Sequence, residues 1–260
     1  MNATDEDFAR ARDALRRAMD LVRSMTRPDL PFEVKAGGGP VTAVDRAVDE
    51  LLRTTLPTRG DGWLSEESDD DLARLHCRRV WIVDPLDGTR SFLAGRPDHA
   101  VSIALVIDGR PVLGAIGAPA ADVTVIGGER HRVEVTGDPG LPWPPADDLL
   151  RVLASRSETK RGEWTPWANG RCHLLPVGSV AYKLALVAGG FADATWTLNG
   201  KHEWDVAAGA ALVTALGGDV WLPLGGDLRW NRRRPRFASF AAAANGRRGA
   251  VDEMLRSARG

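Results

Sequence analysis

The chain has 260 residues, 43% of them apolar and 27% charged, as in globular proteins that bury a hydrophobic core. Its formal net charge of −1 gives no electrostatic footprint for nucleic acid or an anionic membrane, so neither partner is expected. The two cysteines, Cys77 and Cys172, form no CxxC pair and predict a reducing, cytoplasmic location without a disulfide or a zinc site. No apolar run approaches the length of a membrane span.

The first predicted element is a helix that begins at the capping residue Thr4 and ends before Pro28. Its apolar face recurs at helical spacing and consists of Phe8, Ala11, Leu15, Met19 and Val22. After a glycine-rich loop at 36–40, a second amphipathic helix is predicted from Val44, Val48, Leu51 and Leu52. Strands are then predicted at 80–83, 101–107 and 112–116. The pair Asp108–Gly109 predicts a hairpin between the last two strands.

The segment 137–147 contains four prolines and predicts a linker. We expect an N-terminal α+β domain at 1–140 and a C-terminal α/β domain at 146–260. In the second half, strands are predicted at 151–155, 174–177 and 237–244, and helices at 179–189, 204–216 and 247–257. Because strands and helices alternate there, the pattern favours a layered α/β fold.

Two carboxylates, Asp84 and Asp87, follow the predicted strand 80–83 in the string DPLDGT. Crowding negative charge in one corner costs free energy unless a cation neutralises it. Magnesium binds a few carboxylates and keeps its other positions for water and substrate phosphate. The carbonyl of Leu86 offers a neutral ligand, and the helix start at Gly88 and Thr89 offers N–H groups to a phosphate.

Two further acidic positions are Glu66 in LSEES and Asp205 in EWDVAAG. Each piece has a purely structural alternative: a common Asp-x-x-Asp-Gly turn, a solvated acidic edge at Glu66, and a helix cap at Asp205. An EF-hand calcium loop is excluded because its alternating acids are absent. The combination of the pieces is what predicts a metal and phosphate site.

The motifs VKAGGGPVTAVD, LSEES, WIVDPLDGTRSF, VGSVAYKLALVAGGFADA and EWDVAAGAALVTALGG occur in this order along the chain. Together they resemble the inositol monophosphatase superfamily of magnesium-dependent, lithium-sensitive phosphomonoesterases. The resemblance implies an α/β (α+β) fold, a layered αβαβα sandwich of the inositol monophosphatase and fructose-1,6-bisphosphatase type. It also implies an active site between the two halves, two or three Mg²⁺ ions, a small phosphate ester as substrate, and a homodimer.

Residue roles follow from the resemblance by matching motifs. The metal ligands implied are Glu66, Asp84, the carbonyl of Leu86, Asp87 and Asp205. The catalytic residues implied are Thr89 and Asp45, which would orient the attacking water, together with Glu66. The residues implied to bind phosphate or substrate are Gly88, Thr89, Gly178, Ser179 and Lys35.

The substrate expected from the resemblance is 3′-phosphoadenosine 5′-phosphate. The runs LSEESDDDLARLHCRRVWIVDPLDGTR and ADATWTLNGKHEWD are similar to those of 3′(2′),5′-bisphosphate nucleotidases, and Thr197 and Leu198 replace a glutamate of inositol-specific relatives. Arg90–Ser91 and the string SRSET at 155–159 depart from the nucleotidase pattern. Inositol monophosphate, histidinol phosphate or another sugar phosphate therefore remains an alternative, as does a non-catalytic metal-binding relative. Three tryptophans are either core residues or stack on a base: Trp164, Trp167 and Trp196.

Overall fold

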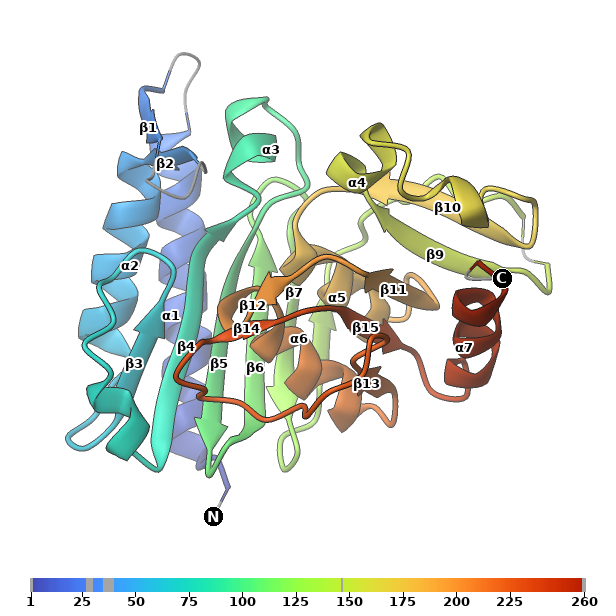
Figure 1. The fold of residues 1–260 in the computed structure, drawn as a ribbon. Coiled ribbons are helices and arrows are strands. Elements are labelled where there is room, and N and C mark those ends of the chain that lie inside the picture. The colour runs from blue at the N-terminus through green and yellow to red at the C-terminus, as the bar shows by residue number, and fades with distance from the viewer. Residues whose placement is uncertain (1, 27–29, 35–39, 146, 259–260) are drawn as a thin grey trace.

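Helices and sheets alternate in five layers in the computed structural model (Figure 1), which describes residues 2–26, 30–34, 40–145 and 147–258. The first layer contains α1 (Asp5–Met25) and α2 (Ala43–Thr55). A six-stranded sheet follows, then α5 (Val180–Ala188) and α6 (Glu203–Ala215), then a five-stranded sheet, and finally α7 (Arg248–Ser257). The predicted αβαβα sandwich is confirmed.

The six-stranded sheet keeps the order of the chain, and its strands are antiparallel except for the first pair. Its members are β3 (Gly62–Ser65), β4 (Arg79–Asp87), β5 (Ala100–Ile107), β6 (Arg110–Ala118), β7 (Val123–Gly128) and β8 (Glu134–Thr136). A short helix, α3 (Thr89–Leu93), follows β4, and a 3₁₀ turn occupies Ala73–His76.

The five-stranded sheet is mixed, with two parallel pairs followed by two antiparallel pairs. Its order is β10 (Cys172–Val177), β9 (Leu150–Ser155), β11 (Ala194–Thr197), β15 (Phe240–Ala243) and β13 (Asp219–Trp221). Between β9 and β10 lie α4 (Arg156–Lys160) and a 3₁₀ turn at Thr165–Trp167. Two small ladders join β1 (Phe32–Val34) to β2 (Pro40–Thr42) and β12 (Lys201–His202) to β14 (Arg236–Phe237).

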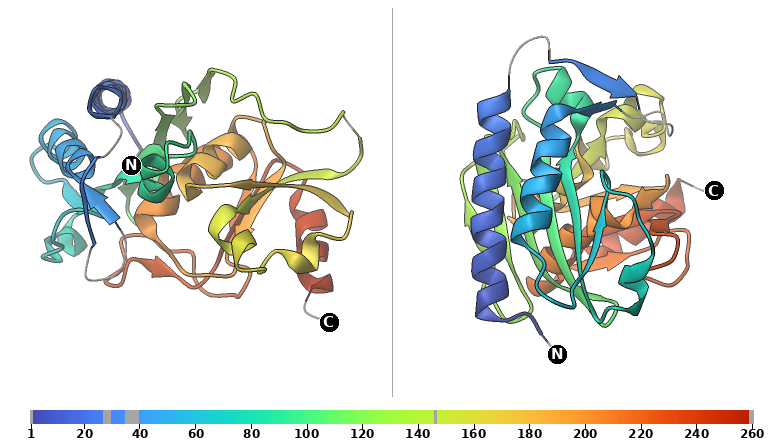
Figure 2. Two further views of the ribbon diagram at one scale, coloured as in Figure 1. Left: turned by 90° about the horizontal axis from the view of Figure 1, so that it is seen from above. Right: turned by 90° about the vertical axis from the view of Figure 1, so that its left-hand side faces the viewer.

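Both faces of the six-stranded sheet are buried, and β5 shows the consequence. Val101, Ile103 and Leu105 pack toward α1 and α2, whereas Ala104 and Val106 pack toward α5 and α6. Because both faces meet helices, the strand is apolar at every position except Ser102 and does not alternate. Figure 2 shows α1 and α2 side by side against one face of this sheet.

Helix α6 lies between the two sheets, which explains why it is apolar on nearly all sides. Small residues allow it to approach β6 closely. A Cβ at Gly114 would lie only 2.2 Å from the carbonyl oxygen of Ala208, so only glycine fits at that strand position. This contact fixes the helix whose first turn carries Asp205.

Both N-terminal helices begin with a capping box, in Thr4 with Asp7 and in Thr42 with Asp45. The hairpin at Asp108–Gly109 is also confirmed, since both residues have positive φ. From 137 to 149 the described residues contain no helix or strand, as predicted for a linker. The core nevertheless joins Ile82 and Ile116 of the first half to Leu153 and Leu212 of the second, so division into two domains stays a prediction.

Two local predictions were wrong. The strand 80–83 continues through Pro85 to Asp87 as β4, because a register shift against β5 accommodates the irregular segment. The predicted strand 237–244 is two strands, β14 and β15, separated at Ala238–Ser239. Among the described helices, none has the length and apolar character needed to cross a membrane. Both cysteines are unpaired thiols.

Candidate metal and phosphate site

Three carboxylates from separate parts of the chain converge at the end of β4. Glu66 follows β3, Asp84 lies within β4, and Asp205 lies in the first turn of α6. Each contributes one oxygen, and these oxygens all lie within 4.8 Å of one another. Asp84 is buried, and Asp205 is partly buried. The structure thus brings together three of the four predicted acidic metal ligands in one group.

The electrostatics of this group favour a bound cation. Burial raises the pKa of Asp84 well above its usual value, and the nearby carboxylates of Glu66 and Asp87 raise it further. Burial also raises the pKa of Asp205, followed by repulsion from the same two acids. An all-oxygen donor set with unfavourable mutual repulsion fits a hard divalent cation such as Mg²⁺.

Asp87 has a second set of contacts. Its Oδ2 accepts hydrogen bonds from Ser179 Oγ at 2.7 Å and from the backbone N–H of Ala181 at 2.6 Å. Burial raises the pKa of Asp87, and these two hydrogen bonds lower it in part. Asp87 therefore ties the metal group to the start of α5, and its role as a metal ligand stays a prediction.

Thr89 and Asp45 are brought together as predicted. Thr89 Oγ1 lies 3.0 Å from Asp45 Oδ1 and 3.1 Å from the carbonyl oxygen of Leu86, so it can donate its single proton to either. Asp45 Oδ2 accepts from the backbone N–H and the hydroxyl of Thr42, at 2.7 and 2.6 Å. The capping box of α2 thus fixes the carboxylate that faces Thr89.

The turn after β4 requires glycine. Gly88 has φ +94°, and a Cβ there would lie 3.0 Å from the carbonyl oxygen of Asp98 and 3.2 Å from Ser179 Cβ. A Cβ at Gly178 would lie 2.4 Å from Ser91 Oγ. The Gly178–Ser179 pair therefore packs directly against the Gly88 turn, which places the predicted phosphate and substrate residues side by side. Lys35 lies outside the described residues.

Sequence reasoning missed a group of charged residues beside this site. Asp98 is 3% exposed and lies in the connection from β4 to β5. Its Oδ2 accepts from Arg156 and from the backbone N–H of Gly178. Because Asp98 and Arg156 are 58 positions apart, no local motif joins them. The one signal was the unusual string SRSET, which contains Arg156.

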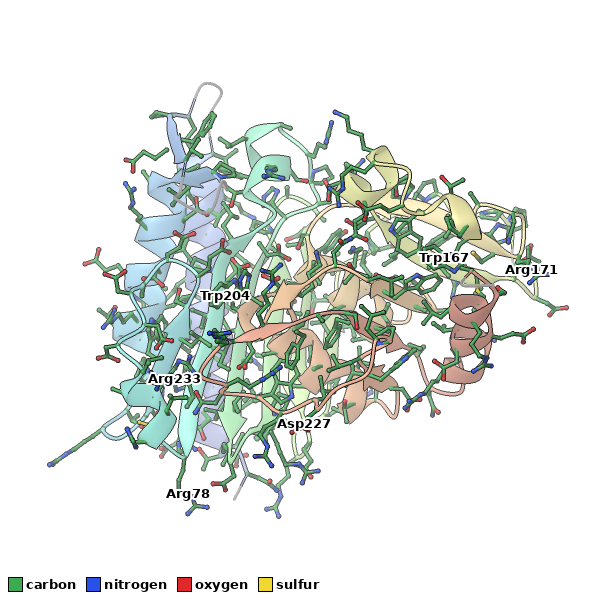
Figure 3. The ribbon with its side chains drawn as sticks, viewed as in Figure 1. Arg78, Trp167, Arg171, Trp204, Asp227 and Arg233 are labelled. Atoms are coloured by element: carbon green, nitrogen blue, oxygen red, sulfur yellow. The ribbon has the colours of Figure 1, made fainter. Side chains whose placement is uncertain are left out.

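The three tryptophans considered for base stacking pack on one another in the outer core of the second sheet. Trp164, Trp167 and Trp196 are 2–5% exposed, with ring centroids 4.9–5.4 Å apart. Figure 3 shows Trp167 at the opposite side of the view from Trp204, the neighbour of Asp205 in the sequence. These contacts favour the packing alternative.

Comparison with known proteins gives concordant results. The family model described as "Inositol monophosphatase family" matches residues 4–256. A 3′-phosphoadenosine 5′-phosphate phosphatase from Mycobacterium leprae is 34% identical over 247 residues, covering 90% of this chain and 88% of the relative. The 3′(2′),5′-bisphosphate nucleotidase CysQ of Escherichia coli is 31% identical over 220 residues, covering 79% and 86%. The crystal structure of CysQ from Bacteroides thetaiotaomicron is similar with a TM-score of 0.75 at 29% identity, covering 92% of this chain and 97% of that one.

Proposed function

This chain belongs to the inositol monophosphatase family of phosphatases, and we propose that it is a magnesium-dependent enzyme that removes the 3′-phosphate of 3′-phosphoadenosine 5′-phosphate. The observation that carries the proposed chemistry is the convergence of Glu66, Asp84 and Asp205 beside the Thr89 turn. The nucleotide substrate is supported by relatives that cover most of the chain and are named for that activity.

The cofactor would be held by Glu66, Asp84 and Asp205, with Asp87 and the carbonyl of Leu86 completing sites for two or three Mg²⁺ ions. When bound, magnesium stabilises charge on phosphoryl oxygens and lowers the pKa of water. The residues of this chain then have positioning tasks. Thr89, hydrogen-bonded to Asp45, orients the attacking water. Glu66 accepts a proton from that water. The N–H groups of Gly88 and Thr89 hold the phosphate.

Substrate residues complete the proposal. Gly178 and Ser179 border the substrate, because they pack against the Gly88 turn and because Ser179 contacts Asp87. Lys35 keeps the substrate role implied by its motif. We also propose that the enzyme works in the cytoplasm as a homodimer and is inhibited by lithium. Light scattering after size-exclusion chromatography tests the dimer, and a mass of one chain would contradict it.

The test of function is phosphate release from a panel of esters by the purified protein in MgCl₂. The panel contains 3′-phosphoadenosine 5′-phosphate, inositol monophosphate, histidinol phosphate and fructose bisphosphate. We expect the highest kcat/KM for the nucleotide, inhibition by lithium, and no release in EDTA. A higher kcat/KM for a sugar ester would favour the alternative substrate class. No release from any ester, with magnesium binding demonstrated by calorimetry, would favour a non-catalytic relative.

A further inference from the structure

An arginine at the start of α4 is held against the phosphate turn by a buried carboxylate. Asp98 Oδ2 accepts hydrogen bonds from both Nε and Nη2 of Arg156, the first at 3.1 Å. The same oxygen accepts the backbone N–H of Gly178. Asp98 is 3% exposed, so this contact is shielded from water and fixes the guanidinium firmly.

A short chain of contacts connects this arginine to the metal group. Gly178 precedes Ser179, whose Oγ donates to Asp87 Oδ2 at 2.7 Å. On the other side, the carbonyl oxygen of Asp98 would lie 3.0 Å from a Cβ at Gly88. Asp98 therefore packs against both segments that surround the reacting phosphate in the proposed mechanism, and Arg156 lies immediately beyond it.

Only part of the guanidinium is used by the protein. The side chain of Arg156 is 40% exposed although its partner is buried. In the described part of the chain, its hydrogen bonds run through Nε and Nη2 alone, which leaves Nη1 available. A guanidinium that is fixed on one edge and open on the other is a pre-organised donor, because it loses little freedom when it binds a phosphate.

We propose that Arg156, positioned by Asp98, binds the second, non-reacting phosphate of a bisphosphorylated substrate. The inference rests on the proposed function and adds the residue that distinguishes a bisphosphate from a monophosphate. The reacting phosphate lies at the Gly88–Thr89 turn, and the second phosphate lies across the Gly178–Ser179 segment from it. The planar donor fork of arginine matches phosphate oxygens in geometry as well as in charge.

Strand β9 carries another arginine, Arg151, which serves as a matched control. Arg151 lies near the start of β9, whereas Arg156 directly follows its last residue. Arg151 is also 40% exposed and is also paired with a largely buried acid, Asp193, at 3.4 Å. The two arginines differ in that Asp98 contacts the Gly178 segment, while Asp193 pairs with Arg247. Arg151→Met therefore reproduces the loss of an ion pair away from the phosphate turn.

The experiment compares kcat/KM for 3′-phosphoadenosine 5′-phosphate and for adenosine 3′-monophosphate, which lacks the second phosphate. In Arg156→Met we expect the ratio of the two values to fall by about 10- to 100-fold, the usual effect of losing a hydrogen bond to a charged group. Arg156→Lys should retain part of the ratio, and Asp98→Asn should lower it less than Arg156→Met. Arg151→Met should leave it unchanged. Because both substrates meet the same enzyme sample, partial unfolding cancels in the ratio.

A second readout is inhibition by adenosine 5′-monophosphate, the product that carries the second phosphate. Its inhibition constant should rise about 10- to 100-fold in Arg156→Met and stay constant in Arg151→Met. Equal losses on both substrates, with an unchanged inhibition constant, would overturn the inference and leave Arg156–Asp98 as a structural ion pair. If wild-type enzyme hydrolyses neither nucleotide but does hydrolyse a sugar ester, the proposed function is contradicted, and the inference fails with it.

Discussion

The two ends of β4 carry buried carboxylates in opposite electrostatic situations. At its first residue, Arg79 donates through Nη2 to Asp7 at 2.7 Å and through Nε to Asp61 at 2.9 Å. Figure 3 marks this end by Arg78 at the bottom of the view. At the other end, Asp84 faces the carboxylates of Glu66 and Asp205. Burial acts on the acids at both ends, so the difference lies in the groups placed around them.

The pKa values express this difference. For Asp7 and Asp61, burial raises the pKa, but hydrogen bonds from Arg79, the Thr4 and Thr58 segments and Trp81 together outweigh it and lower the pKa. For Asp84 and Asp205, burial and neighbouring acids act in the same direction and raise the pKa. The carboxylates of Asp7 and Asp61, which are paired with an arginine of the protein, stabilise the fold. The crowded carboxylates of Asp84 and Asp205 indicate a site for a cation bound from solution.

Removing the Thr89 hydroxyl should have the largest effect on activity, because it removes the group proposed to orient the attacking water. In Thr89→Val we expect kcat to fall by about 10²- to 10⁴-fold, as when a positioned proton-transfer group is lost. Thr89→Ser keeps the hydroxyl beside Asp45 and should retain most of the activity. The two variants are compared by phosphate release at saturating substrate and Mg²⁺. A valine variant within tenfold of the wild type would contradict the role of Thr89.

Removing Arg79, the cation at the first end of β4, should instead lower the stability of the fold. Arg79→Met removes the cation that Asp7 and Asp61 share and leaves only Arg10, 3.7 Å from Asp7, so we expect the free energy of unfolding to fall by about 3–5 kcal/mol. The matched control is Arg78→Met. Arg78 is 67% exposed and pairs with Asp108 at the surface, so its loss should cost much less than the loss of Arg79. Urea unfolding measures both variants, and equal losses would refute the distinction between them.

The dependence of stability on pH gives a smaller effect with a defined sign. Because the pKa values of Asp7 and Asp61 in the folded protein lie below the ordinary aspartate value of 3.8, their contribution to stability is fully present above that pH. It is lost as the pH falls through the folded-state pKa values. Wild-type protein should therefore lose more stability between pH 6 and pH 3 than Asp61→Asn, as measured by urea unfolding. Parallel pH profiles would contradict the assignment.

The candidate site could be predicted where its chemistry is local in the sequence. Asp84, Gly88 and Thr89 lie in one short string, and in combination with Glu66 and Asp205 that string predicts a metal and phosphate site. Glu66 and Asp205 follow or begin elements whose ends meet in a layered fold. The convergence itself depends on packing that no motif encodes, such as the approach of α6 to Gly114.

The rest could not be predicted because it arises from contacts between distant segments. The Asp98–Arg156 pair joins two connections on different sheets, and the string SRSET that contains Arg156 gives no indication of its partner 58 positions away. Asp7, Asp61 and Arg79 likewise come from three segments of the chain. The strand β11 was missed because its sequence, ATWT, is only four residues long and half of it is not apolar. Tertiary pairing with β9 and β15 makes it a strand.

The most direct test of the metal site is thermal unfolding of the wild type and of Asp84→Asn, each in EDTA and in MgCl₂. Asparagine keeps the shape of the side chain and an oxygen that can accept the N–H of Leu86, now 3.0 Å from Asp84 Oδ1, while it removes one crowded charge. Asp84→Asn should be more stable than the wild type in EDTA, because it removes repulsion among the crowded carboxylates, and Mg²⁺ should stabilise the wild type far more than the variant. A wild type that Mg²⁺ does not stabilise, or a variant that is less stable than wild type in EDTA, would contradict it.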